Sequence, residues 1–205
     1  MAFTRLSDYA PGGAIHETQE VYDARLRFGP VQQTVAETCP ADWLAARIKA
    51  AAQVAEADAI GARPIHVSAP TTALTHRNTA DVCKIALNGM KACSQEICLV
   101  FEDAALSSTP AEALRAVREF RRAGYRVGIN ALRSWQSLRV PALMLMVDCV
   151  WINTVHLSIE ADLADSVTEL GVAGVQSIGF GGKWSAYGEY EDAGLTHLFK
   201  ARTDS

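Results

Sequence analysis

Short runs of strand-forming residues alternate with segments of helical periodicity along the 205-residue chain, and no other feature constrains its fold as strongly. Apolar and β-branched runs that indicate strands lie at 21–28, 64–68, 97–101, 125–129, 142–147, 174–180 and 195–199. Helical spacing of apolar residues occurs at 40–60, 79–93, 110–123, 159–170 and 184–193. Strands that alternate with helices form βαβ units in a mostly parallel sheet. The sequence therefore predicts an α/β fold, a TIM-like (β/α) barrel whose chemistry would sit at the carboxyl ends of the strands.

The segment 110–123 carries the clearest helix signals. Thr109 and Glu112 have the spacing of a capping box, Pro110 occupies the first helical position, and Gly124 follows the last turn. Outside its apolar stripe, this helix carries the arginines Arg115, Arg118, Arg121 and Arg122. They indicate either a solvated helix surface or a patch that binds a partner.

Composition excludes several classes of function. A formal charge of −4 and a pI near 5.7 give no global basic field, so neither nucleic acid nor an anionic membrane is an expected partner. The N-terminus lacks the apolar core of a secretory signal. The most apolar run, 140–152, is shorter than the roughly 20 residues that span a bilayer, and Asp148 interrupts it. We expect a single cytoplasmic domain over residues 1–205.

Five cysteines are present, an odd number in no CxxC pattern: Cys39, Cys83, Cys93, Cys98 and Cys149. Most of them fall in apolar segments, where a free cysteine behaves as a small hydrophobe. We interpret them as buried, reduced thiols of a cytoplasmic protein, and a zinc site is the sharper alternative. No cofactor is implied.

Three segments, "ICLVFEDAAL", "AGYRVGIN" and "VPALMLMVD", resemble the LxLEITExxL, LGxxLALDDFG and LPVDxLKID segments of the EAL family, in the same order. The resemblance covers about 14–200 and leaves 1–13 as an N-terminal extension. It implies a barrel of EAL type, with mostly parallel strands and one antiparallel N-terminal strand. Members of this family hydrolyse cyclic di-GMP with divalent cations held by carboxylates and an asparagine at the strand ends.

The resemblance implies that the positions of the family's site are occupied here by residues of which few offer a hard oxygen ligand. They are Asp23, His66, Val100, Asp103, Asn130, Ala131, Met146 and Asp148. Ser177 and Phe180 fall where later glutamates would be. Val100, Ala131 and Met146 offer no oxygen to a cation, so we expect a vestigial site with no catalytic residue, metal or cofactor. His66, at the end of a strand, is expected to be satisfied by hydrogen bonds; a transition-metal ligand and a catalytic base are its alternatives.

The resulting hypothesis is a degenerate EAL-like regulatory protein, not an enzyme, that acts in bacterial signalling by binding another protein. The alternative is a receptor that binds cyclic di-GMP without hydrolysis, through Arg27 and with help from Arg133, Trp135 and Trp184. Under the leading hypothesis cyclic di-GMP binds weakly or not at all. An active phosphodiesterase and an unrelated barrel activity remain further alternatives.

Two surfaces are candidates for the protein partner. One is the arginine-rich helix, and the other is the C-terminal segment with aromatic residues three positions apart: Trp184, Tyr187 and Tyr190. Aromatic residues and arginine are the types enriched in interface hot spots. The sequence does not identify the partner and leaves open a homodimer.

Overall fold

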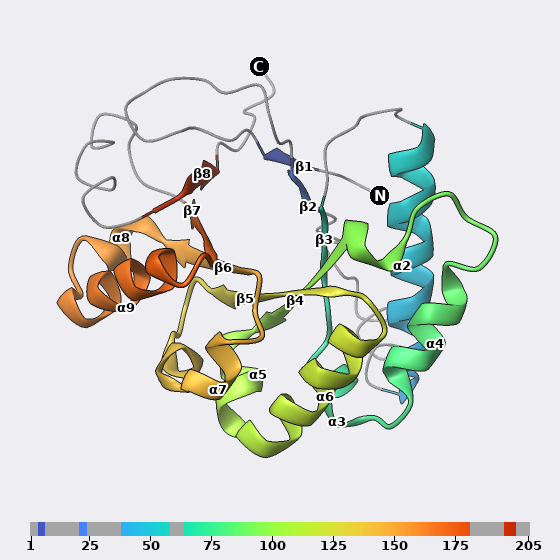
Figure 1. Cartoon of the computed structure of the whole chain (residues 1–205), viewed down its shortest axis with the longest axis horizontal. Coiled ribbons are helices and arrows are strands. Elements are labelled where there is room, and N and C mark those ends of the chain that lie inside the picture. The colour runs from blue at the N-terminus through green and yellow to red at the C-terminus, as the bar shows by residue number, and fades with distance from the viewer. Residues whose placement is uncertain (1–3, 7–20, 24–37, 58–63, 181–194, 200–205) are drawn as a thin grey trace.

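A single sheet of eight strands passes through the computed structural model in chain order, from β1 (Thr4–Leu6) to β8 (His197–Phe199). The structure describes residues 4–6, 21–23, 38–57, 64–180 and 195–199. The pairing of β1 with β2 (Val21–Asp23) is antiparallel, and each later pairing is parallel. The sheet curls, with helices along its outer side (Figure 1). The predicted α/β fold with a parallel, barrel-like sheet is confirmed.

The middle strands are β3 (Ile65–Ser68), β4 (Ile97–Glu102), β5 (Arg126–Ala131), β6 (Cys149–Asn153) and β7 (Gln176–Phe180). The α-helices are α2 (Pro40–Ala57), α3 (Thr72–Thr75), α4 (Thr79–Ala86), α5 (Asp103–Ser108), α6 (Pro110–Arg122), α7 (Pro141–Met144), α8 (Thr154–Leu157) and α9 (Ala161–Val172). Two 3₁₀ turns are η1 (Ser94–Glu96) and η2 (Gln136–Arg139). Within these residues no helix has both the length and the apolar character needed to cross a membrane.

Side chains alternate between the two faces of the sheet, and each face has its own core. On the outer face, residues such as Leu99, Ile129 and Ile152 pack with the helices in the main core. The inner face holds a separate group, called here the inner cluster: Cys98, Val100, Cys149, Trp151 and Ile178, with Leu132 and Phe180 packed against it. The hollow of the curled sheet is therefore lined with apolar and sulfur-containing side chains.

The segment 142–147, predicted as a strand, is not one. Pro141 opens the short helix α7, and the strand β6 begins only at Cys149. Proline at the first position favours a helix because its fixed φ suits the first turn and its missing N–H is not needed there. The apolar run 140–152 is divided between a helix and a strand, and Asp148 lies between them.

Two details of the predicted helices also differ. The helix expected at 79–93 ends at Ala86, and Gly89 adopts a positive φ of 81° in the turn that follows. In α6 the cap residue Thr109 makes no side-chain capping hydrogen bond, so the predicted capping box is absent.

The five cysteines are all free. Cys83, Cys98 and Cys149 are buried, as predicted. Cys39 and Cys93 are exposed, which corrects the expectation that all five thiols lie in the core. Both exposed residues lie just before a helical element rather than inside a strand, so the apolar character of their neighbours did not bury them.

Candidate functional site

Trp151 is the middle residue of β6, and its side chain belongs to the inner cluster in the hollow of the sheet. Its Cα is paired with Asn130 on β5 and with Ile178 on β7, and its side chain is only 2% exposed. The indole Nε1 donates a hydrogen bond of 3.0 Å to Nδ1 of His66. The two rings meet edge to face, with centroids 5.4 Å apart. The indole therefore fills the hollow of the sheet, and it gives the buried imidazole a hydrogen-bond partner.

Asp103 lies at the first position of α5, directly after β4, and is buried. Its carboxylate accepts hydrogen bonds from the backbone N–H groups of Gln136 and Ser137, at 3.0 and 2.8 Å. The hydroxyls of Ser134 and Ser137 also donate to it. Since its oxygens are engaged by the segment that leads into η2, this acid anchors a loop to the edge of the sheet.

The amide side chains at this edge also have local partners. Asn130 donates from Nδ2 to Oε1 of Glu102 at 2.8 Å and accepts from the backbone N–H of Leu132 at 3.1 Å. Asn153, the last residue of β6, accepts from the backbone N–H of Val155 and thereby caps α8. Each of these oxygens stabilises a turn after its strand, which is the usual role of asparagine at such positions.

Two of the predicted site residues are apolar and face opposite sides of the sheet. Val100 belongs to the inner cluster, where its side chain packs between the strands. Ala131 is fully buried in the main core, on the side of the helices. Ser177 is buried on β7 next to the inward-facing Ile178, and Phe180 ends that strand and packs on the inner cluster.

Met146 and Asp148 are not brought to this edge. Both precede β6, at the amino end of the sheet, where Asp148 accepts from the backbone N–H of Val127 at 2.8 Å and forms an ion pair with Arg121. Matching the LPVDxLKID segment five residues further along the chain agrees with the strand. Its lysine then coincides with Trp151 and its last aspartate with Asn153, so the sequence comparison had missed both residues.

Several predicted residues cannot be compared with this geometry. Arg27, Trp184, Tyr187 and Tyr190 lie outside the described residues. For Asp23 the backbone is described, and its Cα is paired with that of His66 across β2 and β3. The structure thus pairs the backbone of Asp23 with His66 and bonds Asn130 to Glu102, whereas the carboxylate of Asp103 faces residues 134–137.

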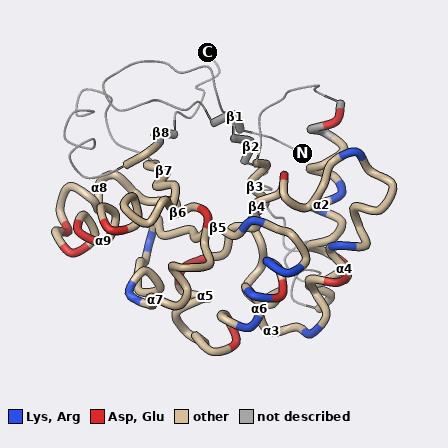
Figure 2. The backbone as a smooth tube through the Cα atoms, in the orientation of Figure 1, with Lys and Arg blue, Asp and Glu red and all other residues tan. Residues whose placement is uncertain are grey.

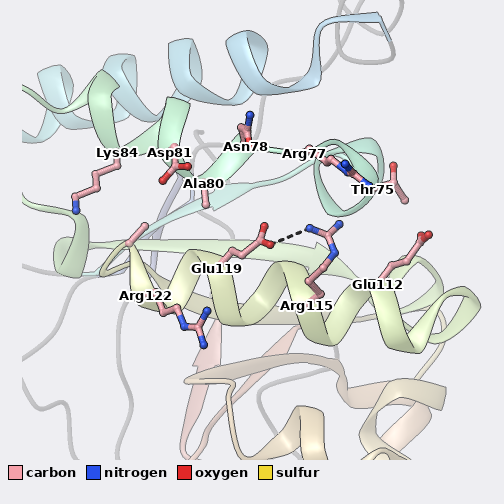
Figure 3. Close-up of a pocket in the computed structure, with 11 residues that line it drawn as sticks. Thr75, Arg77, Asn78, Ala80, Asp81, Lys84, Glu112, Arg115, Glu119 and Arg122 are labelled. Atoms are coloured by element: carbon pink, nitrogen blue, oxygen red, sulfur yellow. Dashed lines mark hydrogen bonds and ion pairs between the residues drawn. The ribbon is translucent and has the colours of Figure 1, made fainter.

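A second concave region lies on the outer side of the molecule, between α6 and the segment of α3 and α4 (Figure 3). This groove has a volume of about 760 Å³. Its charged lining residues are Arg77, Asp81, Lys84, Glu112, Arg115, Glu119 and Arg122. Arg115 pairs with Glu119 at 2.9 Å, one helical turn away.

The predicted arginine surface is exposed: Arg115, Arg118 and Arg122 all reach solvent on α6. In Figure 2 basic residues gather on α6, whereas α9 is marked by acidic residues. Asp162, Asp165 and Glu169 supply that acidic character. The described surface is therefore polarised, with its basic helix on the side that carries the groove.

No family model matches the sequence, and no curated protein matches it either. Solved structures do resemble the fold. The EAL domain of FimX matches at a TM-score of 0.73 and 15% identity, over 97% of this chain and 86% of the other. The PaMucR phosphodiesterase in its c-di-GMP complex matches at 0.73 and 17%, over 97% and 92%.

The EAL domain of Mycobacterium smegmatis DcpA matches with a TM-score of 0.71 and 11% identity, over 97% of this chain and 89% of that one. At such low identity the shared property is the fold. The class defined by the structure is thus an α/β protein with a curled parallel sheet. Within that class, the chain has an EAL-like fold.

Proposed function

We propose that this chain is a non-catalytic EAL-like protein of cyclic di-GMP signalling that acts by binding another protein. The observation that carries the proposal is the buried indole of Trp151, hydrogen-bonded to His66 in the hollow where cations would have to be held. Cations that activate water for attack on a phosphodiester need several oxygen ligands in an open position. An apolar ring at that place supplies none and excludes water.

The remaining polar side chains support the same proposal, because each already serves the backbone. Asp103 accepts hydrogen bonds from residues 134–137, Asn130 bonds with Glu102 and Leu132, and Asn153 caps a helix. Recruiting them as cation ligands would break these contacts and cost several hydrogen bonds, each about 1 kcal/mol or more where a charge is involved. The hydrogen bonds at the carboxyl edge of the sheet thus oppose the binding of a cation there.

The absence of catalysis is tested by incubating the protein with cyclic di-GMP and Mg²⁺ or Mn²⁺. Losing a metal ligand removes several kcal/mol of transition-state stabilisation, and each 1.36 kcal/mol lowers the rate about tenfold. We expect no linear dinucleotide, whereas the PaMucR phosphodiesterase under the same conditions provides the positive control. Turnover by this chain, abolished by an Asn153→Ala or Asp103→Asn substitution, would refute the proposal.

We place the partner surface on α6. Its arginines are exposed, and the groove beside it has charged walls in which cations exceed acids by one. Exposed arginines in a concave region can form bidentate contacts with carboxylates of a partner. Arg122, which lines the groove, and Arg118, which is exposed on the same helix outside it, are the residues to test, because Arg115 already forms an ion pair within the helix.

The surface is tested by affinity capture from the native cell extract with wild-type and variant baits. Arg118→Glu with Arg122→Glu should fold normally, since both side chains are exposed, and should lose the captured partner. The double variant Lys49→Glu with Lys91→Glu changes the charge equally at exposed positions outside the groove and should retain it. Equal capture by both variants would remove α6 from the proposal.

A cyclic di-GMP receptor without hydrolysis is the second candidate. The similar PaMucR structure is a c-di-GMP complex, and here Arg133 is exposed on the loop after β5, next to the half-buried Trp135. A guanidinium and an indole are groups that hold phosphate and a base. Calorimetry with cyclic di-GMP separates the two candidates: sub-micromolar affinity that is lost in Arg27→Ala or Arg133→Ala would favour the receptor.

A further inference from the structure

Three side chains of metal-binding type converge on the inner face of the sheet, near the amino ends of their strands. Within the described part of the chain, the ligand atoms of His66, Cys98 and Cys149 all lie within 4.8 Å of one another. They come from three different strands, β3, β4 and β6, and all three side chains are buried. Residues that are distant in sequence are thus held together by the rigid sheet and not by a loop.

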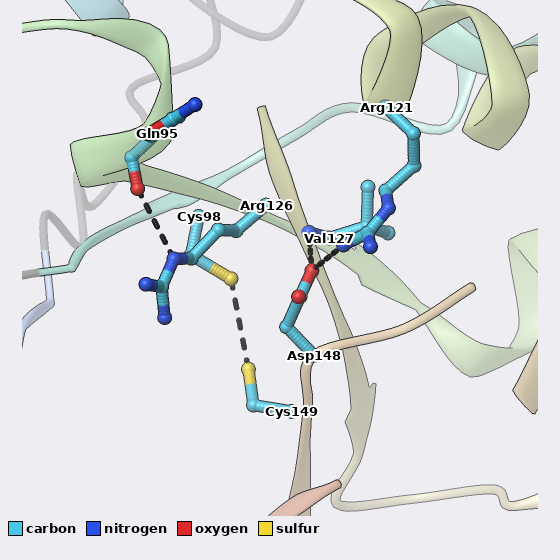
Figure 4. A network of polar contacts seen from close by, with 7 residues as sticks. All are labelled: Gln95, Cys98, Arg121, Arg126, Val127, Asp148 and Cys149. Atoms are coloured by element: carbon cyan, nitrogen blue, oxygen red, sulfur yellow. Dashed lines mark hydrogen bonds and ion pairs between the residues drawn. The ribbon is translucent and has the colours of Figure 1, made fainter. Parts of the chain in front are cut away.

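The separation of the two sulfurs suits a shared cation better than a disulfide. The Sγ atoms of Cys98 and Cys149 are 3.6 Å apart and face each other in Figure 4. A disulfide would require about 2.05 Å. Two thiolates on one tetrahedral zinc ion, each about 2.3 Å from the metal, lie about 3.8 Å apart. The observed spacing therefore already approximates that of a metal-bound pair.

Space for the two sulfurs is created by the strand between them. Gly128 of β5 pairs with both Val100 and Cys149. A Cβ on this glycine would lie 2.6 Å from the Cys149 sulfur and 3.3 Å from the Cys98 sulfur. An alanine at this position would push the sulfurs out of place, so the absence of a side chain here permits the approach of Cys98 and Cys149.

We infer that His66, Cys98 and Cys149 form a binding site for a divalent, thiolate-preferring cation of the zinc type inside the sheet. As each sulfur–metal bond forms, the thiol releases its proton to solvent, so two protons leave for each cation bound. Two thiolates and a divalent cation make a neutral assembly, which suits the apolar surroundings of the inner cluster. Copper(I) with the same ligands would leave a buried negative charge.

The bond between Trp151 and His66 gives the site a specific signature. A neutral imidazole has one nitrogen lone pair, and at present that lone pair accepts the hydrogen bond from Trp151 at Nδ1. Coordination of a cation at either ring nitrogen therefore requires this hydrogen bond to break. The tryptophan and the cation compete for one lone pair, so removing the indole N–H should strengthen binding.

The test is titration of the fully reduced protein with Co²⁺, a spectroscopic substitute for Zn²⁺, over hours because the site is closed. We expect one equivalent to bind, with thiolate-to-cobalt charge-transfer absorption and the visible bands of tetrahedral cobalt. Zn²⁺ should displace the cobalt and abolish both signals. Cys98→Ser and Cys149→Ser should each lose the charge-transfer signal at equimolar cobalt.

The matched control is the triple variant Cys39→Ser, Cys83→Ser, Cys93→Ser, which keeps only the two cysteines of the sheet interior and should bind like wild type. Trp151→Phe should bind more tightly, by about fivefold, because a competing hydrogen bond is gone. An unchanged or weaker affinity in this variant, with its fold verified by circular dichroism, would overturn the assignment of His66.

A measurement on wild type alone decides the case if a cysteine variant fails to fold. X-ray absorption of the zinc-loaded protein should show two sulfurs at about 2.3 Å and one imidazole nitrogen at about 2.0 Å. A shell of oxygen and nitrogen only, or reduced protein that binds no cation at all, would overturn the proposal. So would cobalt binding that survives in the double variant Cys98→Ser, Cys149→Ser.

Discussion

At the residue scale, the carboxyl edge of the sheet contains a buried acid with a structural task. Asp103 is nearly inaccessible to solvent, and its carboxylate holds the segment that carries Ser134, Gln136 and Ser137. A buried carboxylate is tolerated only when hydrogen bonds compensate for its lost hydration. Its donors would in turn be left unsatisfied if the acid were removed.

Asp103→Ala should therefore lower the free energy of unfolding by about 3 kcal/mol, because buried donors to a charged group lose their acceptor. Asp162→Ala is the matched control: its ion pair with Arg139 is exposed, so its loss should cost less than about 1 kcal/mol. Denaturant unfolding of both variants gives the comparison. If the two costs were equal, Asp103 would not be the anchor of this loop.

Individual residues of the site could be predicted only where the strand was assigned correctly. Val100, Asp103 and Asn130 were placed at the strand ends from sequence, because 97–101 and 125–129 are compact apolar runs that correspond to β4 and β5. Trp151 was missed because the strand was expected at 142–147, whereas β6 begins only at Cys149. The pair Val147-Asp148 matches the Val-Asp pair of the LPVDxLKID segment, and apolar residues follow it. This match could have revealed the position of Trp151.

At the element scale, the alternation of strands and helices was predictable and several element boundaries were not. The helical spacing of apolar residues identifies the face of a helix that packs on the core. The long helices α2, α6 and α9 show this spacing. The short helices α5 and α8 each begin directly after a strand and are too short to show a helical period. Asn153 caps α8, whereas α5 has no side-chain cap and packs through its buried residues Asp103, Ala105 and Leu106.

The contact between α4 and Tyr125, the residue before β5, predicts how stability depends on pH. Tyr125 donates a buried hydrogen bond of 2.6 Å to the backbone oxygen of Cys83. Burial raises the pKa of the Cys83 thiol from its ordinary value of 9.0 to about 12. Burial also raises the pKa of Tyr125, with a smaller contribution from Cys83. Both groups are thus held in their neutral forms by the folded state.

Between pH 9.0 and about 12 the unfolded chain has lost the Cys83 proton while the folded protein retains it. Since the unfolded state then binds fewer protons, the free energy of unfolding falls as pH rises, by up to about 1.4 kcal/mol per pH unit for this group. Urea unfolding of wild type and Cys83→Ala at several pH values isolates it. Parallel pH profiles for the two proteins would contradict the prediction.

At the scale of the whole molecule, one sheet keeps two distinct surfaces apart. The hollow of the sheet is filled by the inner cluster, and the basic helix α6 lies on the outer side, behind the main core (Figures 1 and 2). A similar arrangement of strands is found in EAL domains, one of them in a c-di-GMP complex. Because a fold can carry unrelated sites, the surface that binds a partner need not be the edge of the strands.

This separation predicts that cyclic di-GMP and the protein partner do not influence each other. Coupling between two sites requires a ligand that prefers one state of an element shared by both. Under the proposed function, the filled edge offers the nucleotide little to bind, so partner affinity should change by less than about twofold at saturating cyclic di-GMP. Biolayer interferometry with the captured partner, with and without nucleotide, measures this directly. A larger shift that disappears in Arg133→Ala would mean that the edge still senses the nucleotide, and the receptor function would replace the one proposed here.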